Sequence, residues 1–197
     1  MNYDEKCQLL IIGDSSVGKT SIITRFTNGT FNPNYLATVG LDNFTKDETI
    51  DDKNIKVKLW DTAGQERFKS LANGFFRNAQ GIMLVYDITN HESFESLKFW
   101  IESIKNNLGN DLKIPIIIIG NKIDLEEREV KTEEAESFCK NQNIPYFETS
   151  AKTGENIVNL FQKIADDEIL SNPEHLASHS QDSALPPPTM GSSDCSC

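Results

Sequence analysis

The sequence predicts an α/β fold: a six-stranded, mostly parallel sheet with one antiparallel strand and with helices on both faces. Three observations predict this fold. Short apolar runs of strand length alternate with segments whose apolar residues recur at helical spacing. A glycine-containing stretch joins the first of these strands to the first helix. The runs in the middle of the chain are continuously apolar, which is typical of strands buried on both sides.

Six segments have the composition of strands. They span residues 7–12, 41–50, 55–59, 81–86, 114–119 and 144–147. Asp51–Asn54 has the composition of a turn, so the second and third segments are expected to form a hairpin, which supplies the antiparallel strand. Helical segments separate most of the remaining strands, and such connections favour parallel neighbours.

Helices are expected between these strands. The first has Ile22, Ile23 and Phe26 on one face. The clearest has apolar residues at three- and four-residue steps and ends where Gly109 can cap it. These residues are Phe94, Leu97, Ile101, Ile104 and Leu108. Segments 133–140 and 156–170 complete the set, so we expect a domain over residues 1–170. Residues 171–197 are rich in Ser and Pro and lack periodicity, which predicts a disordered tail.

Composition limits the possible functions. With 197 residues, 38% of them hydrophobic, the chain has room for one well-buried core and not for two domains. The net charge of -11 argues against binding to nucleic-acid backbones, which clustered basic residues hold. The N-terminus lacks an apolar segment of signal-peptide length, and the run Ile114–Ile119 is far too short to span a bilayer. We therefore expect the chain in the cytosol.

The stretch Gly13–Ser21 fits the P-loop pattern, in which Gly is followed after four residues by Gly-Lys-Ser/Thr. Its glycines let the backbone curl with N–H groups directed inward, and the positive end of the following helix adds to this anion-binding nest. Lys19 is expected to place its charge between the second and third phosphates of a nucleotide. The Thr20 hydroxyl is expected to be one ligand of a Mg²⁺ ion. The alternative is a glycine-rich turn that binds nothing, and the position between strand and helix favours phosphate binding.

A second stretch, Asp61–Glu66, follows the strand that ends at Trp60, at the edge where open α/β sheets bind ligands. Asp61 offers a carboxylate near the metal. Gly64 is a small residue where a terminal phosphate can be sensed, and Gln65 can orient an attacking water. This stretch therefore supplies what a P-loop lacks for hydrolysis.

Two more stretches at this edge have the composition of a guanine pocket. Asn121–Asp124 follows the Ile-rich strand, and the Asp124 carboxylate can accept hydrogen bonds from the N1–H and the 2-amino group of guanine. Adenine has neither donor and would leave the carboxylate unpaired, which allows discrimination of roughly 10⁴-fold or more. Thr149–Lys152 follows the last strand and closes the pocket, with backbone N–H groups available to the guanine oxygen.

The motif set resembles that of a small GTPase of the Ras superfamily, over residues from about 6 to 170, and its details resemble the Rab branch. The Rab features are the segments Trp60–Phe68 and Phe75–Ala79 and the Cys-x-Cys end of the chain. The resemblance implies a P-loop NTPase (Ras-like) fold. It also implies a switch that binds GTP, hydrolyses it slowly and controls intracellular vesicle and membrane trafficking.

The resemblance assigns roles to matching positions. It implies nucleotide contacts from Ser15, Ser16, Val17, Gly18, Lys19, Thr20, Ser21, Phe31, Thr38, Gly64, Asn121, Lys122, Asp124, Ser150, Ala151 and Lys152. Phe31 would contact the guanine ring, and Thr20, Thr38 and Asp61 would hold Mg²⁺. Gln65, Lys19 and Gly64 would carry the hydrolysis of GTP.

Partners are implied as well. No Arg is clearly placed to stabilise the transition state from within the chain, so a GTPase-activating protein is expected to supply one. The family implies a guanine-nucleotide exchange factor, a GDP-dissociation inhibitor or escort protein, and effectors that recognise the two switch segments in the GTP state. The chain is expected to act as a monomer on the cytoplasmic face of endomembranes and to cycle with the cytosol.

The end of the chain, Asp194–Cys197, resembles the Rab terminus that carries geranylgeranyl groups on two cysteines, here Cys195 and Cys197. Two lipid chains anchor firmly where one is marginal. No Lys or Arg follows Lys163, so we expect little help from anionic lipid. Free thiols in a tail and a metal clip are the alternatives.

Other function classes stay open at this point. A P-loop kinase or metabolic ATPase would share Lys19 and Thr20 but has no use for Asn121–Asp124. A Ras-like GTPase in soluble signalling would lack the lipid anchor. A GTP-binding module would hold the nucleotide without hydrolysing it, and the presence of Gln65 argues against that interpretation.

Overall fold

Strands and helices alternate along the chain in the computed structural model, which describes residues 5–33, 38, 41–50, 53–62, 76, 79–109 and 114–166. The strands are β1 (Glu5–Ile12), β2 (Leu41–Ile50), β3 (Lys53–Thr62), β4 (Gly81–Asp87), β5 (Ile116–Asn121) and β6 (Tyr146–Thr149). The helices in the described part are α1 (Lys19–Asn28), α3 (His91–Leu108), α4 (Thr132–Gln142) and α5 (Ile157–Asp166).

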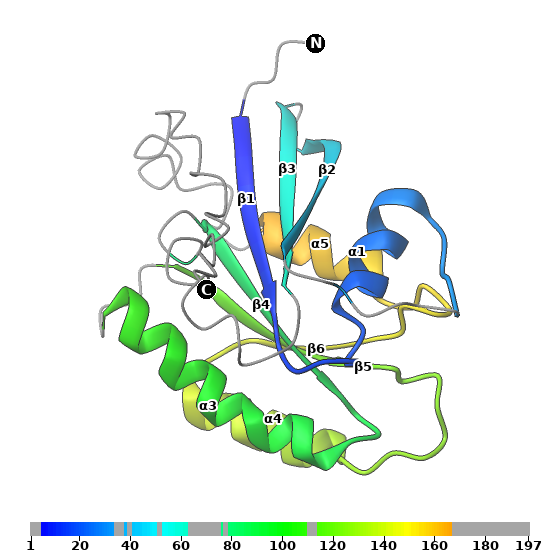
Figure 1. Cartoon of the computed structure of the whole chain (residues 1–197), viewed down its shortest axis with the longest axis vertical. Helices are drawn as coiled ribbons and strands as arrows, with labels where there is room; N and C mark the ends of the chain where they lie inside the picture. Colours follow the sequence, from blue (N-terminus) through cyan, green and yellow to red (C-terminus); the bar gives the residue numbers. More distant parts are fainter. Residues whose placement is uncertain are drawn as a thin grey trace, which may run out of the picture.

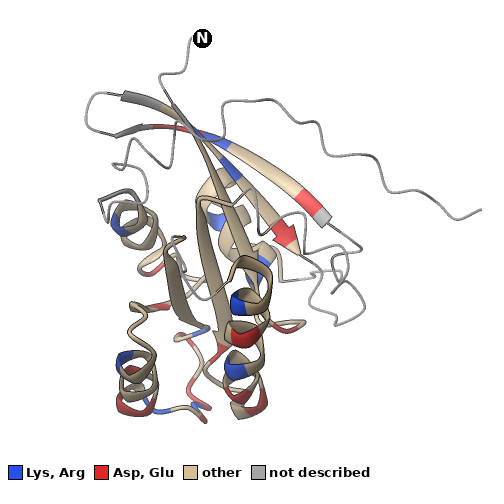
Figure 2. Cartoon of the chain, turned by 90° about the vertical axis from the view of Figure 1, so that its left-hand side faces the viewer, with Lys and Arg blue, Asp and Glu red and all other residues tan. Residues whose placement is uncertain are grey.

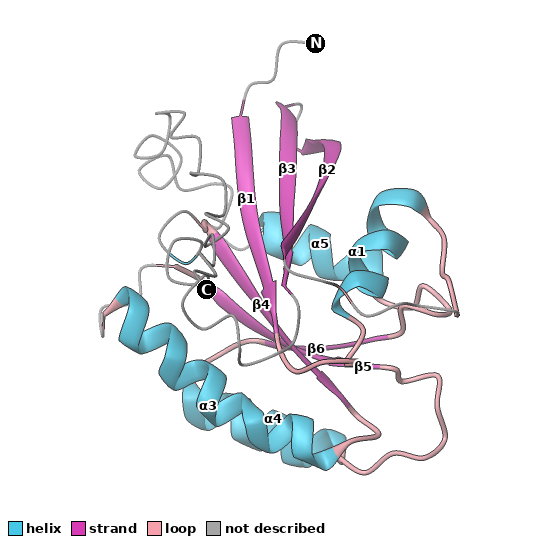
Figure 3. Ribbon diagram, viewed as in Figure 1, coloured by secondary structure: helices cyan, strands magenta, loops and turns pink. Residues whose placement is uncertain are grey.

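One six-stranded sheet has the order β2-β3-β1-β4-β5-β6. Strand β2 is antiparallel to β3, and every other neighbouring pair is parallel. The predicted mostly parallel sheet with one antiparallel strand is therefore confirmed. Because the parallel strands run in one direction, their carboxyl ends meet along a single edge (Figure 3).

Helices cover both faces of this sheet, α1 and α5 on one side and α3 and α4 on the other (Figure 1). The alternation of side chains along β1 explains the two layers. Leu9 and Ile11 pack in the cluster with α1 and α5, whereas Leu10 and Ile12 pack in the cluster with α3 and α4. A strand that contributes to both layers must be apolar at nearly every position, as the continuous runs predicted.

Helix α3 has the expected apolar face, with Phe94, Leu97, Ile101 and Ile104 buried. Its start is set by Asn90, whose side chain accepts a hydrogen bond from the Ser93 backbone N–H at 3.0 Å. The helix ends at Leu108, and Gly109 is its C-cap, as predicted.

Some strand boundaries differ from the prediction, and proline explains two of them. Strands β5 and β6 begin at Ile116 and Tyr146, two residues later than expected, because Pro115 and Pro145 have no N–H to donate to a ladder. Strand β3 continues through Asp61 and Thr62, so Asp61 belongs to the strand and does not follow it. Helix α5 is described as far as Asp166, and the predicted tail lies outside the described residues.

The β2–β3 hairpin carries both acidic and basic residues (Figure 2). Lys46 connects it to helix α1, since its ammonium donates to the Phe26 carbonyl at 2.9 Å and lies 3.9 Å from the centre of the Phe26 ring. The same ammonium is 2.6 Å from a carboxylate oxygen of Glu48. No described helix is both long and apolar enough to cross a membrane.

A half-buried polar network lies between the sheet and α4. The hydroxyls of Tyr86 and Tyr146 are 2.7 Å apart, and Tyr146 donates to Glu148 at 2.8 Å. Arg128 donates to both oxygens of that carboxylate, at 2.8 and 3.0 Å. A Cβ atom at Gly120 would lie 2.8 Å from both tyrosine hydroxyls, so this close packing requires glycine there.

Opposing effects act on the pKa of Glu148. Burial raises it, but the hydrogen bonds from Arg128 and Tyr146 outweigh burial and lower it below the ordinary value of 4.5. A carboxylate whose pKa is lowered by folding contributes stability above its unfolded pKa, and that contribution is lost as the pH falls through the folded pKa.

Replacement of Glu148 by Gln should therefore reduce stability in a pH-dependent way. We expect the free energy of unfolding to fall by about 1–3 kcal/mol at pH 7, and the difference from the unmodified chain to shrink below pH 4.5. Urea unfolding from pH 7 downward, at fixed nucleotide concentration, measures it. Glu136→Gln, at an exposed position of α4, is the control. A difference that stays constant with pH would contradict the assignment.

Candidate functional site

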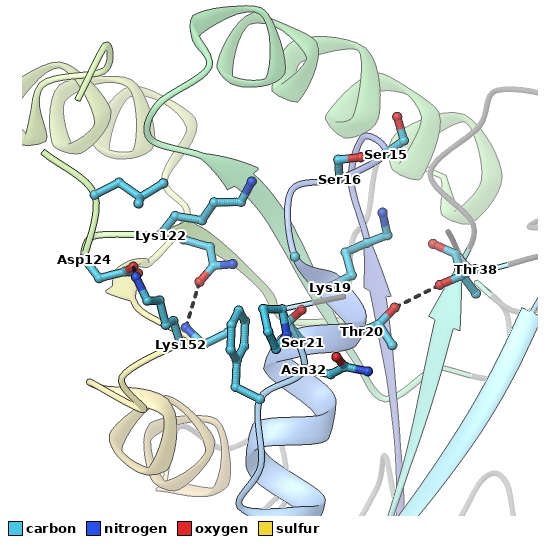
Figure 4. Close-up of a pocket in the computed structure, with 17 residues that line it drawn as sticks. Ser15, Ser16, Lys19, Thr20, Ser21, Asn32, Thr38, Lys122, Asp124 and Lys152 are labelled. Atoms are coloured by element: carbon cyan, nitrogen blue, oxygen red, sulfur yellow. Dashed lines mark hydrogen bonds and ion pairs between the residues drawn. The ribbon is translucent and has the colours of Figure 1, made fainter. Parts of the chain in front are cut away.

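A pocket of about 460 Å³ lies at the carboxyl edge of the sheet (Figure 4). It is lined by residues 15–16, 18–21, 31–33, 38, 62, 121–122, 124–125 and 151–152. These residues come from the loop after β1, the start of α1, the segment between α1 and β2, the last residues of β3 and β5, and the segments that follow β5 and β6. The predicted motifs are thus brought together around one cavity.

The loop between β1 and α1 closes tightly over the sheet. At Gly18 the backbone φ is 98°, and a Cβ atom there would overlap the Asn121 side-chain amide, so only glycine fits. Gly18 is also the N-cap of α1 and offers no side chain to the first N–H groups of the helix. An anion in the loop can therefore accept from these groups. Ser15 and Ser16 are exposed at the rim of the pocket.

Lys19, the first residue of α1, is only 5% exposed. Its ammonium donates to the carbonyls of Gly13, at 2.9 Å, and Asp14, at 2.6 Å. Burial lowers the pKa of Lys19 to about 8, and the carboxylates of Asp61 and Asp14 oppose that shift. A buried ammonium held only by neutral carbonyls and nearby carboxylates gains strongly from a phosphate placed in the loop.

Three oxygen-bearing side chains meet beside Lys19. Thr20 Oγ1 lies 2.9 Å from Thr38 Oγ1 and donates to Asp61 Oδ2, which is 3.2 Å from Thr38 Oγ1. The other carboxylate oxygen, Asp61 Oδ1, is buried and has no hydrogen-bond partner within the described part of the chain. Burial raises the pKa of Asp61, although the hydrogen bond from Thr20 and the charge of Lys19 lower it in part.

This donor set fits a hard divalent cation. Mg²⁺ prefers carboxylate and hydroxyl oxygens and is held by one or two carboxylates together with phosphate oxygens. A cation would compensate the buried charge of Asp61 and give its unpartnered oxygen a ligand. The three side chains are those expected to hold the metal.

The other end of the pocket is built around Asp124. Its carboxylate accepts a hydrogen bond from Ser150 Oγ at 2.6 Å and is 3.4 Å from the Lys152 ammonium. These contacts fix the carboxylate in one orientation at the pocket wall. Ser21 (Figure 4) and Phe31 line the same cavity, and Phe31 packs against the core layer of α1 and α5.

Asn121 is 1% exposed and joins three segments of the site. Its Nδ2 donates to the Val17 carbonyl at 2.9 Å. Its Oδ1 accepts from the Ala151 backbone N–H at 3.2 Å and from Thr149 Oγ1 at 3.3 Å. The side chains of Val17 and Ser150 are likewise buried, so they lie behind the pocket wall and not on it.

Lys122 follows with a backbone φ of 73°, and its ammonium is 2.6 Å from Asp87 Oδ2. The other oxygen of Asp87 accepts hydrogen bonds from the backbone N–H and the hydroxyl of Thr89, at 2.9 and 2.8 Å. Asp87 is 7% exposed. The carboxylate at the end of β4 therefore orients the lysine of the Asn121–Asp124 motif.

Sequence reasoning missed several residues of the site. The lining residues Asn32, Pro33, Thr62 and Leu125 carry no recognisable motif. Asp87 and Trp100 were missed for another reason: their roles depend on contacts between distant segments. Trp100 of α3 donates its indole N–H to Asp14 of the loop at 2.8 Å. The two residues are 86 positions apart, so no local sequence pattern indicates the contact.

Four predicted functional residues lie outside the described residues. They are Gly64, Gln65, Cys195 and Cys197.

Comparison with models of known families identifies the family to which the chain belongs. The model of the Ras family matches residues 8–170. The chain belongs to the Ras family. The matched segment contains the P-loop, the Asp61 stretch and both base-pocket motifs, so the resemblance seen in the motifs extends over most of the chain.

Several curated proteins resemble this Ras-family chain. "Ras-related protein Rab-13" of Rattus norvegicus is 44% identical over 169 residues, which is 85% of this chain and 82% of the relative. "Ras-related protein SEC4" of Saccharomyces cerevisiae is 38% identical over 164 residues, 83% and 75% of the two chains. "Ras-related protein RABE1d" of Arabidopsis thaliana is 36% identical over 204 residues, 98% and 94% of the two chains.

These relatives place the chain among the Rab-like small GTPases of vesicle trafficking, as the motifs predicted. It is a GTP hydrolase and binds guanine nucleotides. The P-loop kinase, the soluble signalling GTPase and the non-hydrolysing module are not favoured.

Asn121→Ala should release nucleotide faster. The substitution leaves the Val17 carbonyl and the Ala151 N–H without their shared partner, and each lost buried hydrogen bond costs about 1–3 kcal/mol. We expect release of a fluorescent GDP analogue to accelerate by about tenfold or more. Asn107→Ala is the control, because the Asn107 amide donates within α3, to the Ser103 carbonyl. Equal release rates in the two variants would contradict this role of Asn121.

Proposed function

We propose that the pocket is the guanine-nucleotide site of a GTP-driven switch, built within residues 1–170 and followed by a tail over 171–197. One observation carries the proposal. A single cavity is lined by Lys19, Thr20 and Thr38 at one end, with the buried Asp61 in contact with both threonines, and by the oriented Asp124 carboxylate at the other. This spacing suits a ligand with phosphates and metal at one end and a base at the other.

Residues at the phosphate end prepare the terminal phosphate for attack. Lys19 places a buried positive charge against the phosphate oxygens, where the low dielectric strengthens it. Thr20, Thr38 and Asp61 would hold Mg²⁺, which when bound supplies further positive charge to the phosphates. Gln65 would orient the water for in-line attack, assisted by Gly64 and by an arginine from an activating protein.

Residues at the base end select guanine. The Asp124 carboxylate would accept from the N1–H and the 2-amino group, and backbone N–H groups of the turn after β6 would be available to the 6-oxo group. Ser150 and Lys152 keep Asp124 in place by their contacts with it. Phe31 covers the base, while Lys122, oriented by Asp87, supports the pocket from the other side.

Thr38 makes the site a switch. Its hydroxyl meets Thr20 and Asp61, so its position responds to what occupies the metal and terminal-phosphate sites. The GTP state would hold the segment around Thr38, and the GDP state would release it. An exchange factor, an activating protein, a GDP-dissociation inhibitor or escort protein, and effectors would each recognise one of these states.

The two terminal cysteines would place the switch on membranes. Geranylgeranyl groups on Cys195 and Cys197 would anchor the chain to the cytoplasmic face of endomembranes, and removal by an escort protein would return it to the cytosol.

Asp124→Asn should change the base preference from guanine to xanthine. An amide presents one acceptor and one donor, which match the N1–H and the 2-oxo group of xanthine and leave the 2-amino group of guanine unpaired. We expect GDP affinity to fall by about 100-fold and XDP to become the better ligand, measured by competition against a fluorescent nucleotide.

The control for this prediction is Glu126→Gln, an exposed residue two positions further along the same loop that does not line the pocket. It should keep the preference for GDP. An Asp124→Asn chain that still prefers GDP over XDP would overturn the assignment of the base end.

The double variant Cys195→Ser, Cys197→Ser should be diffuse in cells in which the unmodified chain labels discrete organelles. Loss of both lipid attachment points removes the anchor. Fluorescence of N-terminally tagged protein in its own cells measures this, with Ser196→Ala as the control that keeps both cysteines. Organelle labelling that persists in the double variant would rule out the lipid anchor.

A further inference from the structure

Arg25 of α1 contacts the loop that follows β6. Its Nε donates to the Ala151 carbonyl at 2.8 Å, and one terminal nitrogen donates to the Lys152 carbonyl. The second terminal nitrogen donates to the Gly29 carbonyl at 2.8 Å, at the C-terminal end of the same helix. All three bonds end on main-chain oxygens, so the guanidinium fixes the course of the backbone.

The loop that Arg25 contacts is a tight turn. The Gly154 N–H donates to the Ser150 carbonyl at 2.8 Å, and the Thr153 N–H donates to Ser150 Oγ at 3.0 Å. These bonds close the turn on itself. The contacts from Arg25 attach the closed turn to α1.

The contacts from Arg25 also affect the side of the turn that faces the base end of the pocket. Within the turn, the Ala151 carbonyl accepts from Arg25 and the Ala151 N–H donates to Asn121 Oδ1. Lys152, the next residue, lines the pocket. Ala151 is 3% exposed. Fixing the Ala151 and Lys152 carbonyls therefore fixes the direction of the backbone N–H groups of the turn as well.

Helix α1 joins the two ends of the pocket through this contact. It begins with Lys19 and Thr20 at the phosphate end, and Arg25 lies on the same helix. A guanidinium suits the task better than an ammonium, because its planar fork has five donors in fixed directions, whereas lysine has one flexible charge centre. The helix that binds phosphate thus also holds the loop that binds the base.

We propose that Arg25 is a positioning residue for guanine recognition: it holds the turn after β6 so that a backbone N–H of that turn meets the 6-oxo group, and it thereby slows nucleotide release. This inference rests on the proposed function of the pocket. It adds a residue with no contact to the nucleotide whose loss loosens the base end specifically.

The test uses the full chain with Arg25→Ala and Arg25→Lys. Release of GDP from the Mg²⁺-containing complex should accelerate by about tenfold or more in Arg25→Ala, because charged hydrogen bonds to the turn are lost. In Arg25→Lys, which keeps the charge but not the fork, the acceleration should be smaller. Arg25→Lys also serves as the informative variant if Arg25→Ala does not fold.

A second readout separates positioning from general loosening. 6-Thio-GDP differs from GDP only at the 6-position, where sulfur is a weaker acceptor than oxygen. In the unmodified chain, the ratio of the 6-thio-GDP to the GDP release rate should exceed one, because the contact between the turn and the 6-position is weakened. In the Arg25 variants this ratio should approach one, since that contact is already lost.

Arg128→Lys is the matched control. Arg128 also makes several hydrogen bonds, but to the Glu148 network and to Val130, so its loss should lower stability and leave the ratio unchanged. Arg25 variants that keep the ratio of the unmodified chain, or release GDP at its rate, would overturn the inference alone. Failure of the unmodified chain to bind GDP would overturn the proposed function first.

Discussion

The side-chain amide of Asn121 is the contact on which the site depends. It reaches Val17, 104 residues earlier, and Ala151, 30 residues later, and all of its bonds are buried. The three walls of the pocket come from separate connections of the sheet, each of which could move independently. One amide with a donor on one side and an acceptor on the other fixes their relative positions, at the point where β5 ends.

Two buried charges give this framework its affinity for ligands. The pKa of Lys19 is lowered and that of Asp61 is raised because both groups have lost water. Each ion is destabilised until an opposite charge arrives, so phosphate and cation are favoured together. A ligand that binds only the folded chain also stabilises the fold by mass action. Stability of the domain and occupancy of the pocket are therefore linked quantities.

Most of the fold could be predicted because it follows from local patterns. The continuous apolar run of β4 and the helical spacing of α3 depend on nearby residues, and both predictions were confirmed. The strand ends were less accurate, since Ile114 and Ile144 have the composition of a strand but precede prolines, which have no N–H to donate to the ladder. The start of helix α5 was predicted more closely: the helical pattern begins at residue 156, and the helix begins at Ile157.

The site divides in the same way. Lys19, Thr20 and Asp124 have motifs with fixed spacing, so their positions around one pocket followed from the chain. Arg25 and Asp87 have none, because what they do depends on which carbonyl or ammonium a distant segment presents to them. Residues that a ligand requires occur in recognisable sequence motifs. Residues that hold them in place are recognised only from the contacts in the three-dimensional structure.

The packing of the tyrosine hydroxyls against Gly120 has a consequence for how such a chain can vary over evolution. Gly120 directly precedes Asn121, and any side chain there would meet Tyr86 and Tyr146 at once. A larger residue at position 120 is tolerable only when both tyrosines are replaced by smaller ones, which also removes two partners of the network around Glu148. The three positions are thus expected to change as a unit among descendants of this chain, although none of them bears a ligand-binding motif.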